Sequence, residues 1–503
     1  MLEQKKEART LPELVAGLSE VYQPIYGHPE LSTRVSRPCE DRLAQITHIY
    51  DLLSAKMGRP LRVLDLGCAQ GFFSLNLAKR GALVYGVDFN DGNIAVCKAL
   101  AAENPELQIG FGCNRVENII ATLPVDDCDM VLGLSVFHHI VHAHGAKTAH
   151  DMLALLAQKV AVGLFEMAVA SEPLAWAQSQ PKNPRNLLGG YAFVHEFAQN
   201  STHLSEITRP FYVASNRCWI LDGQIEAFDR WKAEPHVFSN HAHRGTRRYF
   251  FGADKVLKLC YLDHAEQHSS NLQDHLRALE FWQHRPEGFE MPHLLMHGQY
   301  DNENWMVWEY WEGPLLVDMM RAGTPYDADY IVRNILQQLV VLEAAGFYHD
   351  DVRLWNIVMR ANGKASLIDY GAMRRDKKDC EWPHTPFMAF IVFMHEVFSG
   401  VAENPAPLRA PLLDPQTLPE PYRGAIWHLM ELPEDARSFS ALRDYVSQTD
   451  IAEASKGKPN TAAYTVLFKA MEDYGYTCLR HAQQSAARAQ EAGRALLASR
   501  KQR

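Results

Sequence analysis

The segment from residue 346 to 371, GFYHDDVRLWNIVMRANGKASLIDYG, constrains this chain more than any other feature. It carries the spacing His-x-Asp-x-x-x-x-Asn at His349, Asp351 and Asn356. A short apolar strand follows and ends in Asp-Tyr-Gly, with its aspartate at Asp369. Agreement of both parts at this separation is far more specific than either part alone.

This pattern resembles the catalytic loop and the metal-binding motif of protein kinases. The resemblance implies that Asp351 orients an attacking hydroxyl and accepts its proton, while Asn356 and Asp369 hold the Mg²⁺ that bridges the phosphates of ATP. Arg353 stands where the family has a lysine, so we expect its charge to stabilise the transferring phosphoryl group. His349 is expected to support the loop from behind.

The stretch RRYFFGADKVLKLCYL predicts two strands, and Lys258 matches the lysine that binds the α and β phosphates. A carboxylate on the next helix normally pairs with this lysine. Three acidic residues are candidates, and we favour the last of Glu266, Asp274 and Glu280.

A second stretch, MPHLLMHGQYDNENWMVWEYWEG, resembles the strands and hinge that hold adenine in kinases. The resemblance implies hydrogen bonds from the backbone groups of Glu309 and Trp311 to the base. The helical segment YIVRNILQQLVVLEAAG then precedes the catalytic loop, as the family requires. Each of these segments alone would be ordinary core, and only their order is specific.

Two departures from the kinase pattern bear on the substrate. The phosphate-covering loop has only Gly245 and Gly252 in place of G-x-G-x-x-G, so we expect side chains such as Arg247 or Arg248 to help grip the nucleotide. The arginine that normally precedes the catalytic aspartate is Asp350, and no Ala-Pro-Glu motif follows. Without a long activation segment, a platform for protein substrates is missing. The acceptor is expected to be a sugar or small-molecule hydroxyl, and the enzyme to be constitutively active.

Residues 61–67, LRVLDLG, predict a strand and a tight turn before a helix, and a second strand, ALVYGVD, ends at Asp88. A third strand is expected at CDMVLGLSV. Alternation of strands and helices predicts a parallel, doubly wound sheet whose ligand lies beyond the carboxyl ends of the strands.

The turn DLGCAQG resembles the first motif of class I methyltransferases, with Asp65 before Gly67 and Gly71. Ala69 departs from the family's middle glycine but is small. The resemblance implies binding of S-adenosylmethionine, with Asp88 accepting hydrogen bonds from the ribose. A dinucleotide fold uses the same device, so NAD binding is the alternative, although the form G-x-G-x-x-G is absent.

Other residues of this region admit two interpretations. Asn114 and Val116 fall where the methyltransferase family lines the adenine. His138 and His139 either touch the acceptor or cofactor, or only pack. Residues ahead of the sheet could clamp an anionic acceptor or be solvated surface, namely Tyr22, Tyr26, Arg34 and Arg37.

At 503 residues the chain is too long for one core. We expect a methyltransferase domain over 1–210, a kinase-like α+β domain of two lobes over 211–450, and a helical tail over 451–503. Steps of three and four predict a coiled coil that forms an oligomer. A single amphipathic helix packed on the kinase lobe is the alternative. The steps join Tyr464, Leu467, Met471, Tyr474 and Cys478.

Composition excludes several classes of function. A net charge of -10 gives no support for a nucleic-acid surface. The nine cysteines contain no Cys-x-x-Cys pair, which favours a reducing compartment without structural zinc. Neither a secretory signal nor a membrane span is visible, so a cytoplasmic protein is expected.

Fusion of the two activities suggests one acceptor that is first phosphorylated and then methylated on the phosphate. The domain order, the reduced kinase motifs and the helical tail together resemble the bifunctional kinase-methyltransferases of lipopolysaccharide biosynthesis, which terminate polymannose O-antigen chains. That resemblance implies phosphorylation of the 3-hydroxyl of the terminal mannose on a lipid-linked polymannose, then methylation of that phosphate. It also implies a trimer formed through the tail, association with the elongating mannosyltransferase, and a peripheral position at the cytoplasmic face of the inner membrane. The rivals are a nucleotide-binding scaffold and a protein kinase fused to an unrelated methyltransferase.

Overall fold

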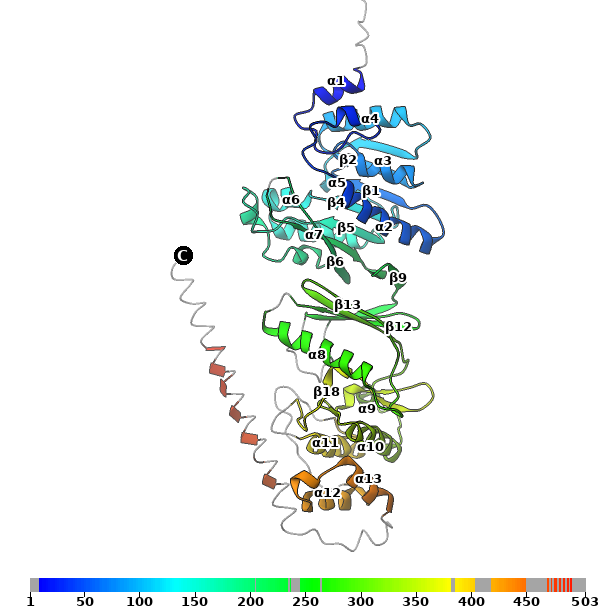
Figure 1. The fold of residues 1–503 in the computed structure, drawn as a ribbon, viewed down its shortest axis with the longest axis vertical. Helices are drawn as coiled ribbons and strands as arrows, with labels where there is room; N and C mark the ends of the chain where they lie inside the picture. Colours follow the sequence, from blue (N-terminus) through cyan, green and yellow to red (C-terminus); the bar gives the residue numbers. More distant parts are fainter. Residues whose placement is uncertain are drawn as a thin grey trace, which may run out of the picture. The chain divides into compact units, whose positions relative to one another are not determined.

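The computed structural model describes residues 9–203, 205–233, 236, 245–262, 265–380, 385–402 and 418–448, together with scattered helical residues between 468 and 490. The side chains of residues 265–269 and 434 lie outside this description. The chain divides into two compact units, Met1–Trp231 and Lys232–Arg503. Each unit is described by itself (Figure 1).

A seven-stranded sheet with the order β3-β2-β1-β4-β5-β7-β6 forms the centre of the first unit. The first five strands are parallel and the last two are antiparallel. This order confirms the Rossmann-like sheet expected from the sequence. The strands are β1 (Arg62–Leu66), β2 (Leu83–Asp88), β3 (Ile109–Cys113), β4 (Met130–Leu134), β5 (Val162–Glu166), β6 (Phe193–Asn200) and β7 (Arg209–Ser215).

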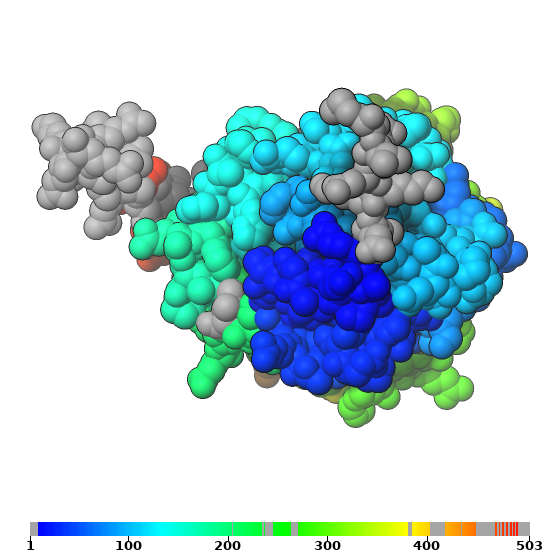
Figure 2. Space-filling view, turned by 90° about the horizontal axis from the view of Figure 1, so that it is seen from above, coloured from blue at the N-terminus to red at the C-terminus, as the bar shows by residue number. Residues whose placement is uncertain are grey.

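Helices separate the parallel strands, as crossover connections require. They are α2 (Glu40–Met57), α3 (Phe72–Lys79), α4 (Asp91–Glu103), α5 (Val116–Thr122), α6 (Phe137–His144) and α7 (Ala146–Ala157). A short first helix, α1 (Leu11–Ala16), packs on α4. Figure 2 shows these dark-blue N-terminal residues as one continuous patch beside lighter blue segments. The N-terminal segment is therefore part of the first unit and helps to cover it.

The boundary between the units differs from the one expected. The sequence placed it at residue 210, which falls inside β7, a strand paired with β5 on one side and β6 on the other. The structure corrects the boundary to Trp231. After β7, the chain forms a hairpin of β8 (Cys218–Leu221) and β9 (Gln224–Ala227). The next strand is β10 (Arg230–Lys232). Antiparallel strands added after the last βα unit carry no local signal of the sheet that they join.

The second unit has the two lobes of a kinase-like fold. Its N-terminal lobe contains an antiparallel run β11-β12-β14-β13 and one long helix. Its C-terminal lobe is mainly helical. The elements of the first lobe are β11 (Arg247–Phe251), β12 (Lys255–Tyr261), α8 (Ala265–Gln283), β13 (Leu294–Tyr300) and β14 (Glu303–Glu309). Those of the second are α9 (Leu316–Arg321), α10 (Ala328–Ala344), β15 (Tyr348–His349), β16 (Ile357–Met359), β17 (Ala365–Leu367), β18 (Met373–Arg374), α11 (Pro386–Ser399), α12 (Tyr422–Glu431) and α13 (Phe439–Gln448).

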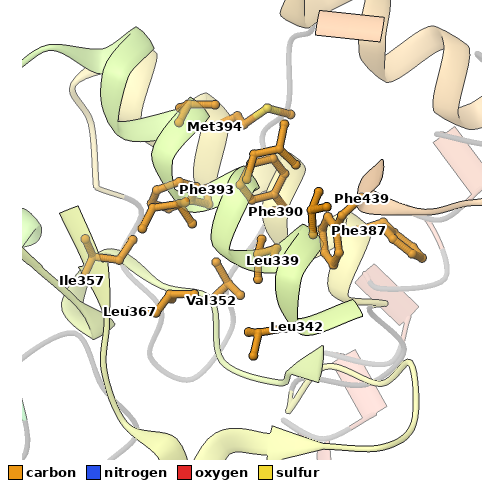
Figure 3. Packing of buried hydrophobic residues seen from close by; sticks show 14 of the residues in the cluster. Leu339, Leu342, Val352, Ile357, Leu367, Phe387, Phe390, Phe393, Met394 and Phe439 are labelled. Carbon is orange, nitrogen blue, oxygen red and sulfur yellow. The ribbon is translucent and has the colours of Figure 1, made fainter. Parts of the chain in front are cut away.

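A single aromatic and aliphatic core fixes the segment that carries the catalytic loop. Figure 3 shows Val352 of the loop among side chains of α10, α11 and α13, including Leu339, Phe390 and Phe439. All four residues are essentially inaccessible to solvent. Burial on this scale stabilises by roughly 25 cal/mol for each Å² of apolar surface removed from water. The catalytic loop is thus anchored through its apolar residues, which leaves its polar residues for chemistry.

The tail can be followed only in part. The described residues between 468 and 490 are helical, and Phe468, Tyr476 and Leu479 among them are more than half exposed in this single chain. The positions from which the coiled coil is expected, Tyr464 to Cys478 in steps of three and four, lie outside the described residues, so the coiled coil stays a prediction. Within the described part of the chain, no helix has the length and apolar character to cross a membrane.

Candidate active sites

The catalytic loop of the second unit brings two of the expected residues together. The side-chain amide of Asn356 donates to Asp351 Oδ2 over 2.6 Å and to the carbonyl oxygen of Asp351 over 2.9 Å. The backbone N–H of Ile368 donates to the carbonyl of Asn356 over 2.9 Å, which joins the loop to the strand that leads to Asp369. The loop therefore holds Asp351, Asn356 and Asp369 in one constellation, as the spacing predicted.

His349 supports this constellation from within the lobe. It is fully buried, and its Nδ1 accepts from the N–H of Asp351 over 3.2 Å. Its Nε2 must then carry the proton and donate to the carbonyl of Ile368 over 3.0 Å. Burial is the main reason that the pKa of His349 is lowered, so the ring stays neutral. One side chain thus fixes both the catalytic loop and the strand before Asp369.

Lys258 and Asp369 form the ion pair at the centre of the site. Lys258 Nζ lies 3.2 Å from Asp369 Oδ1. Burial works to lower the pKa of Lys258, but the carboxylate of Asp369 outweighs it and the pKa is raised. Burial likewise opposes ionisation of Asp369, yet Lys258 and Arg247 hold the pKa of its carboxyl well below the usual value. Asp369 has φ of +68°, a left-handed conformation that is rare outside glycine and is typical of strained functional positions.

The helical carboxylate beside Lys258 is Asp274, which corrects the expectation of Glu280. A small cavity is lined by Lys258, Asn271, Asp274 and other residues of α8 and the sheet. Glu280 instead pairs with Arg375 over 3.2 Å, and both side chains are half exposed. The side chain of Glu266 lies outside the described residues. Because Asp274 and Glu280 are six residues apart, they cannot share one face of α8.

Asp274 also binds the cation that the sequence proposed for the nucleotide. It forms an ion pair with Arg247, whose Nε donates to Asn271 Oδ1 over 2.7 Å. Arg247 is on the strand next to Lys258, and its charge lowers the pKa of Asp369. A side chain at Gly371 would meet the backbone of Asp274 at 3.0 Å, so the Asp-Tyr-Gly motif needs its glycine to approach α8. Arg248 instead lies over the ring of Tyr261.

Asp350 reverses the charge that protein kinases place before the catalytic aspartate. Its Oδ2 lies 3.4 Å from Arg374 Nη1 and 3.9 Å from Arg277 Nη1. The arginines thus come from α8 and from the segment after Asp369. Burial raises the pKa of Asp350 to about 7. The acidic residue links both segments to the loop, and constitutive activity stays a prediction.

Arg353 has a buried carboxylate partner that the sequence did not indicate. Its side chain is 1% exposed and pairs with Asp379, with Nη2 2.7 Å from Oδ1 and Nη1 3.1 Å from Oδ2. Its Nε lies 3.6 Å from Asp351 Oδ1. A guanidinium engaged in this way inside the lobe supports the position of Asp351, and its expected role toward the transferring phosphoryl group stays a prediction. The sequence could not show this, because Asp379 is 26 residues away in a polar stretch.

The expected hinge residues, Glu309 and Trp311, lie at and just after the end of β14. Glu309 ends β14, and its N–H donates to the carbonyl of His293 over 2.9 Å. Trp311 follows it, with the guanidinium of Arg360 3.9 Å from the ring centre. The roles of Glu309 and Trp311 toward adenine remain predictions.

The first unit forms its site at the end of β1. Gly67 and Gly71 have φ of +74° and +77°, and Ala69 between them has φ of +49°. The middle residue of the motif thus adopts the conformation that favours glycine. The N–H of Ala69 donates to Asp88 Oδ2 over 3.0 Å, so the loop and the end of β2 are tied together. Asp65 lies behind the loop, 2% exposed, and accepts from Ser74 Oγ over 2.6 Å.

Two glutamines that the sequence analysis did not single out fix the N-terminal segment to this loop. Gln70 Oε1 accepts from the N–H groups of Tyr22 and Gln23 over 3.1 and 3.0 Å. Gln23 Oε1 accepts from the N–H of Phe72 over 3.1 Å. These partners are more than 45 residues apart, so no local pattern indicated them. Asn114 and Val116 follow β3, with the Asn114 N–H donating to the carbonyl of Asp88 over 3.0 Å.

The residues singled out for an acceptor separate into buried and exposed members. Arg37 is 2% exposed and donates to both carboxylate oxygens of Glu166, whereas Arg34 is exposed. Surface solvation is therefore the wrong interpretation for Arg37. His138 is buried, and burial lowers its pKa to about 2, so it stays neutral, while His139 is exposed.

Comparison with known proteins agrees with the fold classes of both units. A family model described as a methyltransferase domain matches residues 63–159. The O-antigen chain terminator bifunctional methyltransferase/kinase WbdD of Escherichia coli is 40% identical over 440 residues, which cover 86% of this chain and 62% of the relative. The chain therefore spans about three fifths of the length of that relative.

Solved structures extend the comparison over both units. A medium-resolution structure of the bifunctional kinase-methyltransferase WbdD has a TM-score of 0.79 at 38% identity, covering 92% of this chain and 99% of that one. A low-resolution structure of WbdD with an ordered C-terminal bundle has a TM-score of 0.84, also at 38% identity, and covers 95% and 97%. The similarity therefore covers both units of the chain and is not limited to the methyltransferase domain. The chain belongs to the family of the bifunctional kinase-methyltransferase WbdD.

Proposed function

We propose that this protein phosphorylates a sugar hydroxyl with ATP and then methylates the new phosphate with S-adenosylmethionine. The observation that carries the proposal is the joined constellation of Lys258, Asp369, Asn356 and Asp351. A scaffold that only binds nucleotide would have no need for all four side chains in this arrangement. Two sites in one chain would allow one acceptor to be modified twice.

In the kinase step, Asp351 accepts the proton of the attacking hydroxyl as its oxygen bonds to the γ-phosphorus and the bond to ADP breaks. Asn356 fixes the carboxylate through its bond to Oδ2, and Lys258 binds the phosphates. Asp369 is held ionised and is a fitting oxygen ligand for Mg²⁺, together with the amide oxygen of Asn356. When bound, Mg²⁺ would neutralise charge on the phosphates.

In the methylation step, an oxygen of the phosphate monoester bonds to the methyl carbon while the bond from that carbon to sulfur breaks. The nucleophile is already anionic, so no general base is needed, and positioning with exclusion of water suffices. Asp88 would accept from the ribose hydroxyls of the donor, and the loop from Gly67 to Gly71 lets its backbone approach closely. Asp65 supports the loop from behind.

The acceptor is proposed to be the 3-hydroxyl of the terminal mannose of a lipid-linked polymannose, so that modification ends chain growth. Support comes from the relatives, whose names describe O-antigen chain terminators. From the resemblance stated above, we also propose a helical tail over residues 451–503 that forms a homotrimer, a partner in the polymannose-elongating mannosyltransferase, and a peripheral position at the cytoplasmic face of the inner membrane. Nucleic acid is not a proposed partner, given the net charge of -10.

The test is to incubate the full chain with ATP, Mg²⁺, S-adenosylmethionine and a short mannose oligosaccharide, and to weigh the product. A gain of one phosphate and one methyl group is expected, with the methyl group present only on phosphorylated product. No gain of phosphate would favour the scaffold. Strong phosphate transfer to a mixed peptide pool, with none to the mannose oligosaccharide, would favour a protein kinase instead.

A further inference from the structure

A cluster of buried charges lies at the carboxyl end of the first unit's sheet. Ser135 follows β4, Glu166 ends β5, and Arg209 begins β7, which runs antiparallel to β5. All three therefore meet at one edge. The same edge holds the methyl-donor loop, because a side chain at Gly67 would lie 3.1 Å from Val136, the neighbour of Ser135.

Ser135 is the common partner of the cluster. Its Oγ accepts from Arg37 Nη1 over 3.0 Å and from Arg209 Nη1 over 3.1 Å, and it bonds to Glu166. Arg209 is also bidentate to Glu172, over 2.9 and 2.6 Å. Ser135 has φ of +55°, which is costly for a side chain with a Cβ and persists where the surroundings impose it. Two guanidinium groups are thus brought to one hydroxyl beside the donor loop.

The cluster carries more positive than negative charge. Arg37, Arg42 and Arg209 are each at most 4% exposed, and they face two glutamates, Glu166 and Glu172. Three cations against two anions leave a surplus of one positive charge in a buried region, where charge is expensive without a partner.

The buried arginines also act electrostatically on two exposed histidines, His139 and His203. Burial and then Arg209 lower the pKa of His139. Burial also lowers the pKa of His203, and among the nearby charges Arg37, Arg209 and Arg42 lower it further, against Glu20, which raises it. Tyr22, to whose hydroxyl Arg37 donates over 3.2 Å, is half-buried. The positive field therefore extends from the buried arginines to groups that solvent reaches.

We propose that Arg37 and Arg209, joined by Ser135, bind the phosphate monoester that receives the methyl group. This inference rests on the proposed function and assigns its methyl acceptor to these residues. Guanidinium groups suit phosphate because their N–H groups match its oxygens in pairs. Both terminal nitrogens of Arg37 already donate, to Tyr22, Ser135, Glu166 and Ser201, so Arg37 offers its buried Nε–H alone. Ser135 and Glu172 accept three of the five N–H groups of Arg209, which leaves the others for a ligand.

The charge of the cluster suits the reaction. A sugar phosphate dianion attacks the methyl group of a sulfonium cation, and the products are a methyl phosphodiester with one negative charge and a neutral thioether. No proton is released, and the sulfur takes the electron pair of the broken bond. A surplus of one positive charge attracts the dianion more than the diester, so the product leaves and is not methylated again. The two glutamates keep the attraction from being strong enough to hold the product.

The test uses a synthetic mannoside 3-phosphate, which bypasses the kinase site, with S-adenosylmethionine and the full chain. Two double variants each remove one guanidinium group together with the glutamate that binds it in bidentate fashion: R37Q with E166Q, and R209Q with E172Q. The matched control is R80Q with D51N, which neutralises an exposed bidentate pair. Turnover, KM for the mannoside phosphate and the affinity for S-adenosylmethionine are measured for each.

We expect kcat/KM for the mannoside phosphate to fall about 100-fold in each double variant, mainly through KM, while the control matches the wild type. Affinity for S-adenosylmethionine should stay within threefold in all variants, since a merely structural role would change it. Normal kcat/KM in both double variants, or a loss of donor affinity equal to the loss of turnover, would overturn the inference. If the wild type binds the mannoside phosphate in calorimetry, the variants bind it weakly and no methyl is transferred, the inference stands and the proposed function fails.

Discussion

Lys258 Nζ lies 3.2 Å from Asp369 Oδ1, so the cation expected to bind phosphate and the carboxylate expected to bind metal are paired before either ligand arrives. Kinases usually pair this lysine with a carboxylate of the following helix, and here the nearby helical carboxylate, Asp274, binds Arg247 instead. Arg247 and Lys258 thus form a pair of cations on adjacent strands. We infer that Arg247, as a second cation, helps to bind the nucleotide phosphates in place of the missing glycine-rich loop.

Asp274→Asn should lower kinase turnover at least tenfold, because Arg247 would lose its ionic partner and the position of α8 beside Asp369 would change. Glu280→Gln is the matched control, since this residue pairs with Arg375 at a half-exposed site, and turnover should stay within twofold. Phosphate transfer to a mannose oligosaccharide measures both. Equal losses in the two variants would restore Glu280 to the role given by the sequence.

Asp351→Asn should abolish both phosphate and methyl incorporation into an unphosphorylated acceptor, because the second reaction depends on the first. Asp88→Asn should abolish methylation alone, since its carboxylate holds the donor loop through Ala69. Mass spectra of the product made with both cofactors separate the two effects. Methylation that survives Asp351→Asn on unphosphorylated acceptor contradicts the sequential scheme.

Ala69→Gly should stabilise the first unit by about 1 kcal/mol, because an L side chain at φ of +49° is strained. Gly71→Ala is the opposite case and should destabilise it, since φ is +77° and the new methyl group would lie 3.1 Å from Cys97 and Phe111. Hydrogen exchange in peptides from β1 and α3 reports both changes. Protection that falls in Ala69→Gly would contradict the prediction.

Arg353→Met or Asp379→Leu alone should cost about 3–5 kcal/mol in the second unit, because each leaves a buried charge without its partner. The double variant should recover most of this stability, since it leaves no unpaired charge, yet its kinase turnover should stay low because Arg353 also supports Asp351. Urea unfolding and phosphate transfer are measured on the same samples. Full turnover in the double variant would show that Arg353 acts only on stability.

The stability of the first unit should fall as pH rises from 4 to 6. Burial raises the pKa of Asp65 to about 6, so the folded state keeps a proton that the unfolded chain releases near pH 4. Stability contributed by that proton is complete below pH 4 and lost above pH 6. Asp65→Asn should flatten this dependence in hydrogen exchange of β1 and α3. A pH profile that is the same in both proteins would contradict the assignment.

Sequence patterns were sufficient to predict the fold classes of both domains and to indicate the residues of the catalytic loop. His349, Asp351, Asn356 and Asp369 lie within 21 residues of one another, and their order is imposed by chemistry that tolerates few substitutes. The strand, turn and helix around Asp65 and Asp88 were equally local. These residues could be identified from their spacing because each one lies at or near the end of a strand that its own local sequence predicts.

Ion-pair partners from distant segments could be identified from the three-dimensional fold alone. Asp379 forms an ion pair with Arg353, and Arg375 forms one with Glu280. Arg37 and Arg209, which are 172 residues apart, both donate to Ser135. Each pair depends on which charged groups the fold brings within about 4 Å of each other, and a charge in the interior is costly unless the packing supplies a partner. A sequence shows which residues can carry a charge. The packing of the sheet and helices determines which of these charged residues form ion pairs with each other.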